Sequence, residues 1–579
     1  MGTSPRVPRT LLVILLSSLK KYAKKFCTFP FGLVVSLKET FTNTHFDDLF
    51  RFCSTTWSMA VVCSLCGEDT AEEQEITCVV LGGNPCWACK ERADIQDQMK
   101  RLEQEMIKLK AKYRALGTTV NAIHDPFIHK FPPEIGSHIF RLCLPTPLTH
   151  SIFDYPSCTQ EAFLWALKLG AVCRKWRELA WATPNLWETL SITVIPSTLR
   201  TLARSWPGLI SEWLGRSGVL PLTITFRRDG FSSNDEEEEE FDDATNRIIE
   251  VINSHSSRWR HLSLKVDADI PERFSGSMDP NQLFLLELAV YGRRSLTQNF
   301  MMKSKPFPTH LTLDNFSPTS IDIGWDNIIH ATLSNISANE CVEVLRRAPA
   351  VEYFTASDFI RPSDNSPVNV DALVHPRIRS LHLSNKSSKI LDMIKIPALK
   401  EWTHFQESRH LPVDAMVSLI KRSGCYLKIL NLQYIPVRSE NLPSLFQAMP
   451  SLERLKIQFR SSSQNVNDVL DDILLRIFRS PPDKSTIPAN PSRETFLPCL
   501  QFMNCKTQFS WDRVPQLYRQ GHRHSLTLKA PANRSQTSDE TAMELLKLVD
   551  EGAKFVISDD LEGGDFLTNF RKRMGSEGR

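Results

Sequence analysis

The sequence predicts a multidomain chain of α and α/β class, in which a short coiled-coil helix and a three-helix unit precede an irregular α/β repeat solenoid. Three observations lead to this prediction. The chain has 579 residues, enough for several domains at roughly 100–200 residues each. Apolar residues recur with the spacing of a coiled-coil seam over residues 95–116. A Leu-x-Leu pattern recurs about every 24 residues over residues 261–457.

The composition excludes several classes of protein. Hydrophobic residues make up 41% and charged residues 23% of the chain, which is enough apolar material for folded cores and excludes a wholly disordered chain. The formal net charge of +3 is too small to predict a nucleic-acid or membrane-surface partner. The sequence has no run of 18 or more apolar residues, so we expect no membrane-spanning helix.

Residues 1–58 carry the positive balance of the chain. Arg6 and Arg9 precede the apolar run Leu11–Leu16, and lysines follow it, a pattern seen in signal or transit-like leaders. The alternative is a poorly structured extension, or a misplaced gene start with Met59 as the true first residue. This segment holds eight Lys and Arg against three Asp and Glu, so residues 59–579 hold 61 against 63. The rest of the chain is therefore slightly acidic.

Residues 59–90 form a segment with two cysteine pairs. Cys63 and Cys66 make one Cys-x-x-Cys pair, and Cys86 and Cys89 make the other, with 19 residues between them. Two such pairs are typical of a tetrahedral thiolate zinc site. Without a nearby histidine to suggest an open coordination position, the zinc would be structural, and we expect no other cofactor. The alternative is a loose linker with reduced cysteines.

The remaining cysteines are scattered through apolar segments, for example at Cys143, Cys173, Cys341 and Cys499. Buried free thiols in a reducing compartment explain this distribution more simply than disulfides. We therefore expect the protein in the cytoplasm, the nucleus or both.

Residues 91–117 are predicted to form a coiled-coil helix that ends at Gly117. The apolar residues alternate spacings of 4 and 3, which is the average of 3.5 required for a seam. Placing Met99 and Met106 at position a puts Glu105 at g and Lys110 at the next e, a favourable interchain pair. The pattern predicts either a homodimer through residues 95–116 or a single helix that packs within its own chain. The seam residues are Ile95, Met99, Leu102, Met106, Leu109, Tyr113 and Leu116.

Residues 127–190 are predicted to form a three-helix unit. Pro133 suits the first turn of a helix, where its missing amide costs nothing, and Glu134 complements the helix dipole there. A second helix is expected through residues 164–179, after the proline-interrupted stretch 145–158. Residues 182–187 are predicted to form a capped turn into a third short element.

This segment resembles the F-box family in its fungal form. The opening motif of the family is matched by Phe131-Pro132-Pro133-Glu134-Ile135 and Ile139-Phe140, the later Val-Cys-Arg-x-Trp-Arg by residues 172–177, and the closing Pro-x-Leu-Trp by Pro184–Trp187. The match covers about 60 residues, with the motifs in the family's order. The departures are Phe131, where the family has leucine, and an insertion over residues 145–163.

The resemblance implies an adaptor-binding module of an SCF-type ubiquitin ligase, with a cullin recruited through the adaptor. A small helical unit of this kind presents apolar side chains that a partner helix covers. Each side chain of the implied face would otherwise pack inside the three-helix unit. The implied adaptor face consists of Phe131, Pro132, Pro133, Ile135, Ile139, Phe140, Val172, Cys173 and Trp176.

Residues 191–560 carry an irregular repeat. Strand-like pairs are centred at positions 264, 288, 313, 333, 383, 432 and 457, and weaker candidates at Tyr353-Phe354 and Leu399–Trp402 fill the two longest gaps. A period of 20–29 with Leu-x-Leu-x-Asn is the signature of a leucine-rich repeat. Asn315, Asn335 and Asn385 favour this interpretation, because a buried amide there would satisfy turn backbone groups. The alternative is a generic α/β domain.

Two segments are predicted to lie outside the packed structure. The acidic run within residues 232–243 is expected to form a solvated loop. Residues 561–579 are expected to form a flexible tail.

The sequence contains none of the motifs of common enzyme classes, so we expect a non-catalytic protein. The predicted function is the substrate-recognition subunit of a cullin-RING ubiquitin ligase, with the adaptor on residues 127–190 and an unknown protein substrate on the repeat domain. Two alternatives stay open. One is an F-box and repeat scaffold without a ligase role, and the other is a zinc-stabilised regulatory factor that recognises its target through the cysteine pairs and the helix.

Overall fold

The architecture is taken from a computed structural model of the chain. Contacts divide the chain into two units, Met1–Asp94 with Ser197–Arg204, and Ile95–Pro196 with Ser205–Arg579. The second unit holds nearly all of the described residues. The structure describes residues 86–124, 131–144, 157–195, 205–228, 235–277, 279, 282–291, 299–357, 372–384, 388–406, 410–436, 441–460, 464–480, 496–507, 510–522, 525–532, 537–559 and 564–577.

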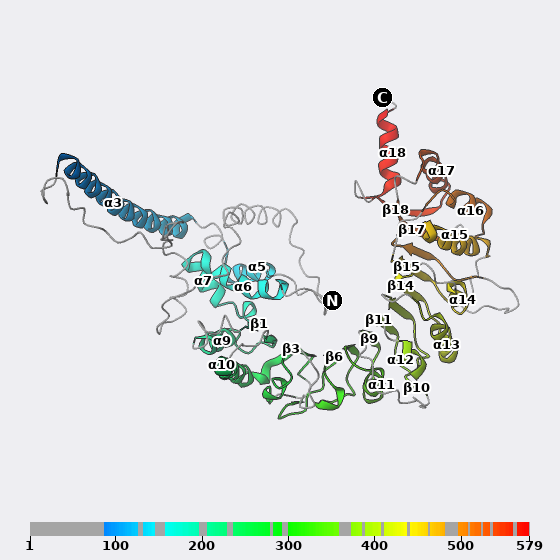
Figure 1. The fold of residues 1–579 in the computed structure, drawn as a ribbon, viewed down its shortest axis with the longest axis horizontal. Coiled ribbons are helices and arrows are strands. Elements are labelled where there is room, and N and C mark those ends of the chain that lie inside the picture. The colour runs from blue at the N-terminus through cyan, green and yellow to red at the C-terminus, as the bar shows by residue number, and fades with distance from the viewer. Residues whose placement is uncertain are drawn as a thin grey trace. The chain divides into compact units, whose positions relative to one another are not determined.

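The fold is mixed α/β, built on one large parallel sheet of 14 strands (Figure 1). The strands follow one another across the sheet in chain order, and each neighbouring pair is parallel. They are β1 (Thr189–Val194), β2 (Leu222–Arg228), β3 (Trp259–Val266), β4 (Leu285–Val290), β6 (His310–Asp314), β8 (His330–Ser334), β9 (Tyr353–Ser357), β11 (Ser380–Ser384), β13 (Glu401–Phe405), β14 (Ile429–Ile435), β15 (Arg454–Phe459), β16 (Phe502–Cys505), β17 (Thr527–Ala532) and β18 (Lys554–Asp559).

Two short parallel pairs lie outside this sheet, β5 (Phe300–Met301) with β7 (Ile321–Asp322), and β10 (Leu373–Val374) with β12 (Ile394–Lys395). The α-helices of the described residues are α3 (Trp87–His124), α5 (Pro133–Leu142), α6 (Ser157–Val172), α7 (Arg174–Trp181), α9 (Trp206–Arg216), α10 (Asp235–Ser254), α11 (Ala338–Arg347), α12 (Ser388–Met393), α13 (Val413–Ser423), α14 (Leu442–Gln447), α15 (Gln464–Arg479), α16 (Val514–Gln520), α17 (Asp539–Asp550) and α18 (Phe566–Glu577). None of these helices is both long and apolar enough to cross a bilayer.

The predicted strand positions are confirmed. All seven centres and the candidate Tyr353-Phe354 lie in sheet strands, which are β3, β4, β6, β8, β9, β11, β14 and β15. Of the candidate Leu399–Trp402, Trp402 lies in β13 and Leu399 precedes that strand. The sequence pattern missed β1, β2 and β16–β18. Along most strands buried and less buried residues alternate, because successive side chains of a strand point to opposite faces. The buried face packs against the helices, and the other face is the one we call the open face.

Helix boundaries follow local chemistry. Ser337 begins α11 with a capping box: its hydroxyl accepts a hydrogen bond from the amide of Glu340, and its own amide donates to the Glu340 carboxylate at 2.9 Å. Gly424 ends α13 in the left-handed conformation, with φ of 61°. Sequence chemistry thus fixes where these helices turn back toward the sheet.

The asparagines after two strands behave differently from each other. Asn315 and Asn335 both adopt the left-handed conformation, with φ of 55° and 54°. The Asn315 amide donates to the carbonyl oxygen of Val290 at 3.0 Å, so it satisfies a backbone group at the end of β4 as expected. Asn335 is exposed, and its amide donates to Asp314 at 2.7 Å. Asn385 lies outside the described residues.

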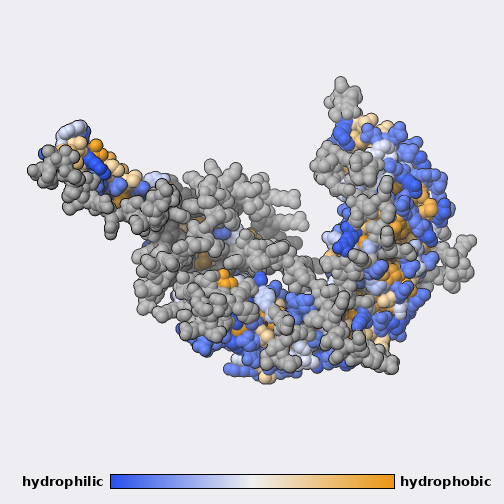
Figure 2. All heavy atoms as spheres, in the orientation of Figure 1, coloured by the Kyte–Doolittle hydropathy of each residue, from blue (hydrophilic) through white to orange (hydrophobic). Residues whose placement is uncertain are grey.

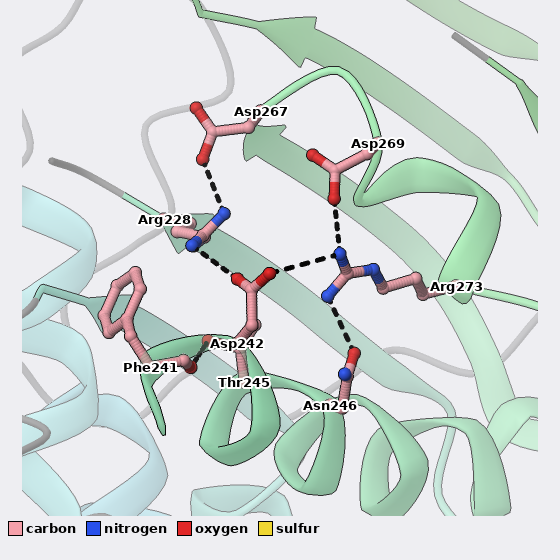
Figure 3. Close-up of polar contacts among 8 residues, drawn as sticks. All are labelled: Arg228, Phe241, Asp242, Thr245, Asn246, Asp267, Asp269 and Arg273. Carbon is pink, nitrogen blue, oxygen red and sulfur yellow. Dashed lines mark hydrogen bonds and ion pairs between the residues drawn. The ribbon is translucent and has the colours of Figure 1, made fainter. Parts of the chain in front are cut away.

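The expectation of an acidic loop over residues 232–243 is wrong, because the acidic run forms the first turns of α10. Figure 3 shows the reason at Asp242, which lies between two arginines. The buried guanidinium of Arg228 on β2 pairs with Asp242 at 2.6 Å and with Asp267 at 2.9 Å. Arg273 also contacts Asp242, at 3.7 Å. These contacts hold α10 against the ends of β2 and β3.

Two other boundaries differ from the prediction. Residues 566–577 of the expected flexible tail form α18, which buries Phe566, Leu567 and Phe570. The helix α3 continues through Gly117 to His124. A Cβ atom at Gly117 would meet nothing within 4 Å, so this glycine lies on an exposed helix face, where it costs only about 1 kcal/mol of helix stability.

Candidate protein-binding site

The first helix of the site begins at the prolines. Pro132 is the residue before α5, with extended backbone angles, and Pro133 occupies the first helical position. The carbonyl oxygen of Pro132 accepts hydrogen bonds from the amides of Ile135 and Gly136 at 3.0 and 3.1 Å. Because proline has no amide to satisfy, the helix starts here without loss. Glu134 and Arg141 lie at the first and last turns, each at the end of α5 whose partial charge it complements.

The predicted second helix is interrupted at Cys173. Residues 157–172 form α6 and residues 174–181 form α7, and Cys173 between them has an extended backbone. Its sulfur accepts a hydrogen bond from the amide of Trp176 at 3.4 Å, so this cysteine caps α7. The Arg177 side chain donates to the carbonyl oxygen of Gly170 across the break, at 3.1 Å. The expectation of a continuous helix over residues 164–179 is therefore wrong.

Phe140 belongs to the interior of the helical unit. It is buried, and its ring lies 4.9 Å from the Trp176 ring, between centroids. Ala166 and Leu169 of α6 and Ala180 of α7 are buried with it. The resemblance implied that Phe140 lies on the adaptor face, but in this chain its side chain holds α5 against the other helices.

An apolar stripe is exposed on the other side of α5. Ile135 is 45% and Leu142 is 62% exposed, and Ile139 between them is half-buried. Residues at i, i+4 and i+7 share one helix face. Pro132 and Pro133 are exposed beside the start of this stripe. Leu142 was not among the expected adaptor contacts, although its helical spacing from Ile135 would have indicated it.

The other expected contact residues lie between these extremes. Val172, at the end of α6, is 46% exposed. Phe131, Cys173 and Trp176 are half-buried, so each side chain divides its surface between the interior of the unit and solvent. The structure thus places eight of the nine expected residues at least partly on the surface.

A tryptophan joins the helical unit to the sheet. Trp187 is fully buried two residues before β1, and its ring nitrogen donates to the carbonyl oxygen of Ala180 at 2.8 Å. Its ring packs edge-on against Trp213 of α9, with centroids 4.5 Å apart. The Arg216 guanidinium lies over both Trp181 and Trp187, at 4.1 and 5.0 Å from the ring centroids. The closing motif of the unit therefore has a packing role.

Of the cysteines expected to be buried, Cys341 is buried, whereas Cys143, Cys173 and Cys499 are half-buried. Burial raises the pKa of Cys143, that of Cys425 to about 11 and that of Cys505 to about 12. These groups are therefore neutral at physiological pH and have little nucleophilic or ligating character.

Only half of the predicted zinc site lies in the described region. Cys86 immediately precedes α3 and Cys89 lies in its first turn. Two thiolates at a helix start suit one knuckle of a tetrahedral site. Cys63 and Cys66 lie outside the described residues. Within residues that the structure describes, no three His, Cys, Asp or Glu side chains gather as a metal site, so the zinc site stays a prediction.

The open face of the sheet carries polar and aromatic rows. The hydroxyls of Ser334 and Ser357, on neighbouring strands, lie 2.8 Å apart. His310 and His330 stack at 4.1 Å, and His330 stacks on Tyr353 at 4.3 Å. Burial, with the neighbouring histidines as a smaller cause, lowers the pKa of His310 to about 4. These imidazoles are therefore neutral at physiological pH.

The sequence was compared with protein families and with curated proteins. No protein-family model and no curated protein matches this chain.

Proposed function

We propose that the protein is the substrate-recognition subunit of an SCF-type ubiquitin ligase, and that it binds the adaptor through the unit of α5, α6 and α7. The observation that carries this proposal is the exposed stripe of Ile135, Ile139 and Leu142. The unit already closes its own core through Phe140 and Trp176. An apolar stripe left over beside a complete core favours a partner helix that covers it.

The motifs of the F-box resemblance support this choice of partner. The residues that match them divide into a buried set, with Phe140 and Trp187, and an exposed set, with Pro132, Pro133 and Ile135. An adaptor-binding module needs both, because it must hold its shape and still offer apolar surface. The ligase chemistry would then belong to the partners, and the large parallel sheet would present substrate to them.

Co-purification with the adaptor tests the proposal. We expect the double variant Ile135→Asp with Leu142→Asp to lose adaptor binding, because it places two charges in an apolar contact. Val219→Asp is the matched control: Val219 is 92% exposed in the segment between α9 and β2, and the adaptor should still bind. Equal thermal melting of both variants would show that folding is unaffected. Undiminished binding of the double variant would refute the assigned face.

We also propose that α3 pairs with a second copy of the chain. Its seam residues are all at least half exposed, and Val120 extends the heptad beyond the predicted end. Figure 2 shows hydrophobic residues on the surface of this helix. Four consecutive heptads support a parallel or antiparallel pair better than three. Light scattering should then give twice the mass of 66.0 kDa. Met106→Lys should give a monomer. Ile107 is also apolar but lies outside the seam, so Ile107→Lys should leave the dimer intact. A monomeric wild-type chain would refute the pairing.

A further inference from the structure

Three of the last four strands of the sheet carry positive charge on their open face. Arg454 and Lys456 lie on β15, Lys529 on β17 and Lys554 on β18. Their strand positions alternate with buried residues such as Leu455, Leu528 and Phe555, so all four side chains are on the face opposite the helices. We call these four residues the basic face.

The register aligns the basic face in two rows. Lys456 is opposite Asn504, which in turn is opposite Lys529. Arg454 is opposite Phe502, followed by Thr527 and Lys554. With neighbouring strands about 4.8 Å apart, the charges within a row are about 10 to 14 Å apart. The two rows therefore place well-separated cations along a line that crosses the strands.

The residues opposite the four cations on neighbouring strands include no carboxylate. Among the described residues of β14 to β18 the one Asp or Glu is Asp559, the last residue of β18, at a strand position that alternates with that of Lys554. Two acidic residues close to these cations in sequence pair with other groups: Glu453 with Lys428 at 2.8 Å and Asp550 with Arg571 at 2.6 Å. The positive charge of this face is thus left without a partner among the described carboxylates.

The other end of the sheet is built differently. Lys265 on β3 lies 3.3 Å from Glu287 on β4, the next strand, and Glu287 also accepts a hydrogen bond from Ser263 at 2.6 Å. The charge of Lys265 on this part of the open face is therefore neutralised in place. Residues 59–579 as a whole carry a net −2, so the basic face is a local segregation of charge and not a property of the whole chain.

We propose that the basic face binds an extended peptide segment rich in Asp and Glu, which belongs to the substrate; this inference rests on the proposed function. The cations are spread singly, with the neutral Asn504 and Thr527 between them. Such spacing suits a series of single carboxylates along an extended chain. A dianionic phosphate would favour two or more cations that converge on one point. The amides of Asn431 and Asn504, next to Lys456 in its row, would bond the peptide backbone.

The aromatic content of the face argues against single-stranded nucleic acid. Base stacking needs exposed rings along the path of the strand. In the rows of the basic face Phe502 is the aromatic residue, and the Arg454 guanidinium lies 5.2 Å from its ring centroid. That ring is therefore partly covered by the chain's own cation.

The test is fluorescence anisotropy of a labelled 15-residue Asp/Glu peptide with the full-length protein. We expect binding that weakens as salt rises. Lys529→Glu with Lys554→Glu, both exposed positions, should weaken binding about tenfold or more. The matched control is Lys421→Glu with Lys547→Glu, which makes the same charge change on α13 and α17 and should leave binding unchanged. Lys456→Gln, which adds no charge, should weaken binding by a smaller factor.

Several outcomes would overturn the inference. Equal binding of an Asn/Gln peptide would show that charge does not select the ligand. Binding of a phosphoserine peptide or an oligonucleotide, but not of the Asp/Glu peptide, would assign another class of ligand. An equal loss in the control variant would show non-specific attraction.

Adaptor co-purification separates this inference from the proposed function. If the wild-type chain binds the adaptor but not the peptide, the basic face fails and the ligase role stands. If it binds the peptide through Lys529 and Lys554 but not the adaptor, the ligase role fails and the peptide surface stands as a property of the chain.

Discussion

The buried arginine Arg228 offers a test of how the acidic helix is held. Its side chain is 3% exposed, and those of its partners Asp242 and Asp267 are 36% and 13% exposed. Replacing Arg228 by Met keeps a long apolar stem but leaves both carboxylates without this cation. Breaking a buried pair costs about 3–5 kcal/mol. Asp242 still has Arg273 at 3.7 Å and is partly solvated, so most of the cost comes from the unpaired carboxylate of Asp267. We expect the free energy of opening this region to fall by about 3–4 kcal/mol.

Native-state hydrogen exchange is the suitable assay. In a sheet whose strands contact mainly their neighbours, local regions can unfold separately. A single free energy of global unfolding would then not show a loss of stability confined to one region. Amides of β2 and α10 should exchange about 100- to 1000-fold faster in Arg228→Met, since every 1.4 kcal/mol is tenfold. Adding Asp242→Asn and Asp267→Asn should recover most of the protection, because no buried charge is then left unpaired.

Arg247→Met is the control for this experiment. Arg247 pairs with Asp243 on the exposed side of the same helix, and such a pair contributes about 1 kcal/mol or less. If Arg228→Met changes exchange no more than Arg247→Met, the ion pairs do not hold α10. If the triple variant with Arg228→Met, Asp242→Asn and Asp267→Asn exchanges its amides as fast as Arg228→Met alone, the faster exchange results from lost packing and not from unpaired charges.

Three further predictions concern other parts of the chain. Burial lowers the pKa of His404 to about 4, so the stability that its neutral form provides is complete above pH 6.5 and is lost as the pH falls toward 4. Between pH 7 and pH 5 the free energy of unfolding of His404→Gln should fall by ~2 kcal/mol less than that of the wild type, and a pH-independent difference between the two proteins would contradict this. Trp187→Ala should cost about 3–5 kcal/mol and raise exchange in α7 and β1, whereas unchanged exchange there would separate Trp187 from the junction. Metal analysis of the full chain should give one zinc per chain, lost when the four predicted ligands are changed to serine, and absence of zinc from the wild type would remove the site; the four are Cys63, Cys66, Cys86 and Cys89.

The strand positions were predictable because one residue type marks them. Each Leu-x-Leu pair places two leucines on the buried face, and parallel strands in sequence order repeat that pair at a nearly constant interval. The strands β2 and β16 are not separated from β3 and β15, respectively, by the repeat interval of about 24 residues. α10 lies between β2 and β3, and α15 lies between β15 and β16. The alternation over Leu222–Arg228 would still have indicated a strand, had it been judged without the period.

The acidic run shows how charge can hide a helix. Asp235–Glu240 suggests a solvated loop when taken alone. The apolar residues Phe241, Ile248 and Ile252 that follow are buried on one helical face, and this 3.6-residue pattern could have extended the helix backward. Arg228, 14 residues away in sequence, could not have been assigned to Asp242, because nothing in the sequence pairs a strand residue with a helix residue across a loop.

The basic face could not be seen from composition for a related reason. The total charge of the chain is near zero, and lysines at 456, 529 and 554 are far apart in sequence. Only the register of β15 to β18 brings them into two rows. Inspecting the exposed positions of each strand would have shown basic residues with no acidic residue opposite them. That inspection requires the order of the strands, which the sequence alone does not give.

The division of α5 into a buried face and an exposed face could have been predicted from the sequence. At about 100° per residue, Ile139 and Leu142 lie within about 40° of Ile135, whereas Phe140 is about 140° away. The family motif places Ile139 and Phe140 side by side and so suggests a common role. Helical geometry separates them, and the burial of Phe140 beside the exposure of Ile135 and Leu142 follows from that phase. A variant at Phe140 would therefore report on folding, whereas variants in the stripe of Ile135, Ile139 and Leu142 would test the proposed adaptor contact.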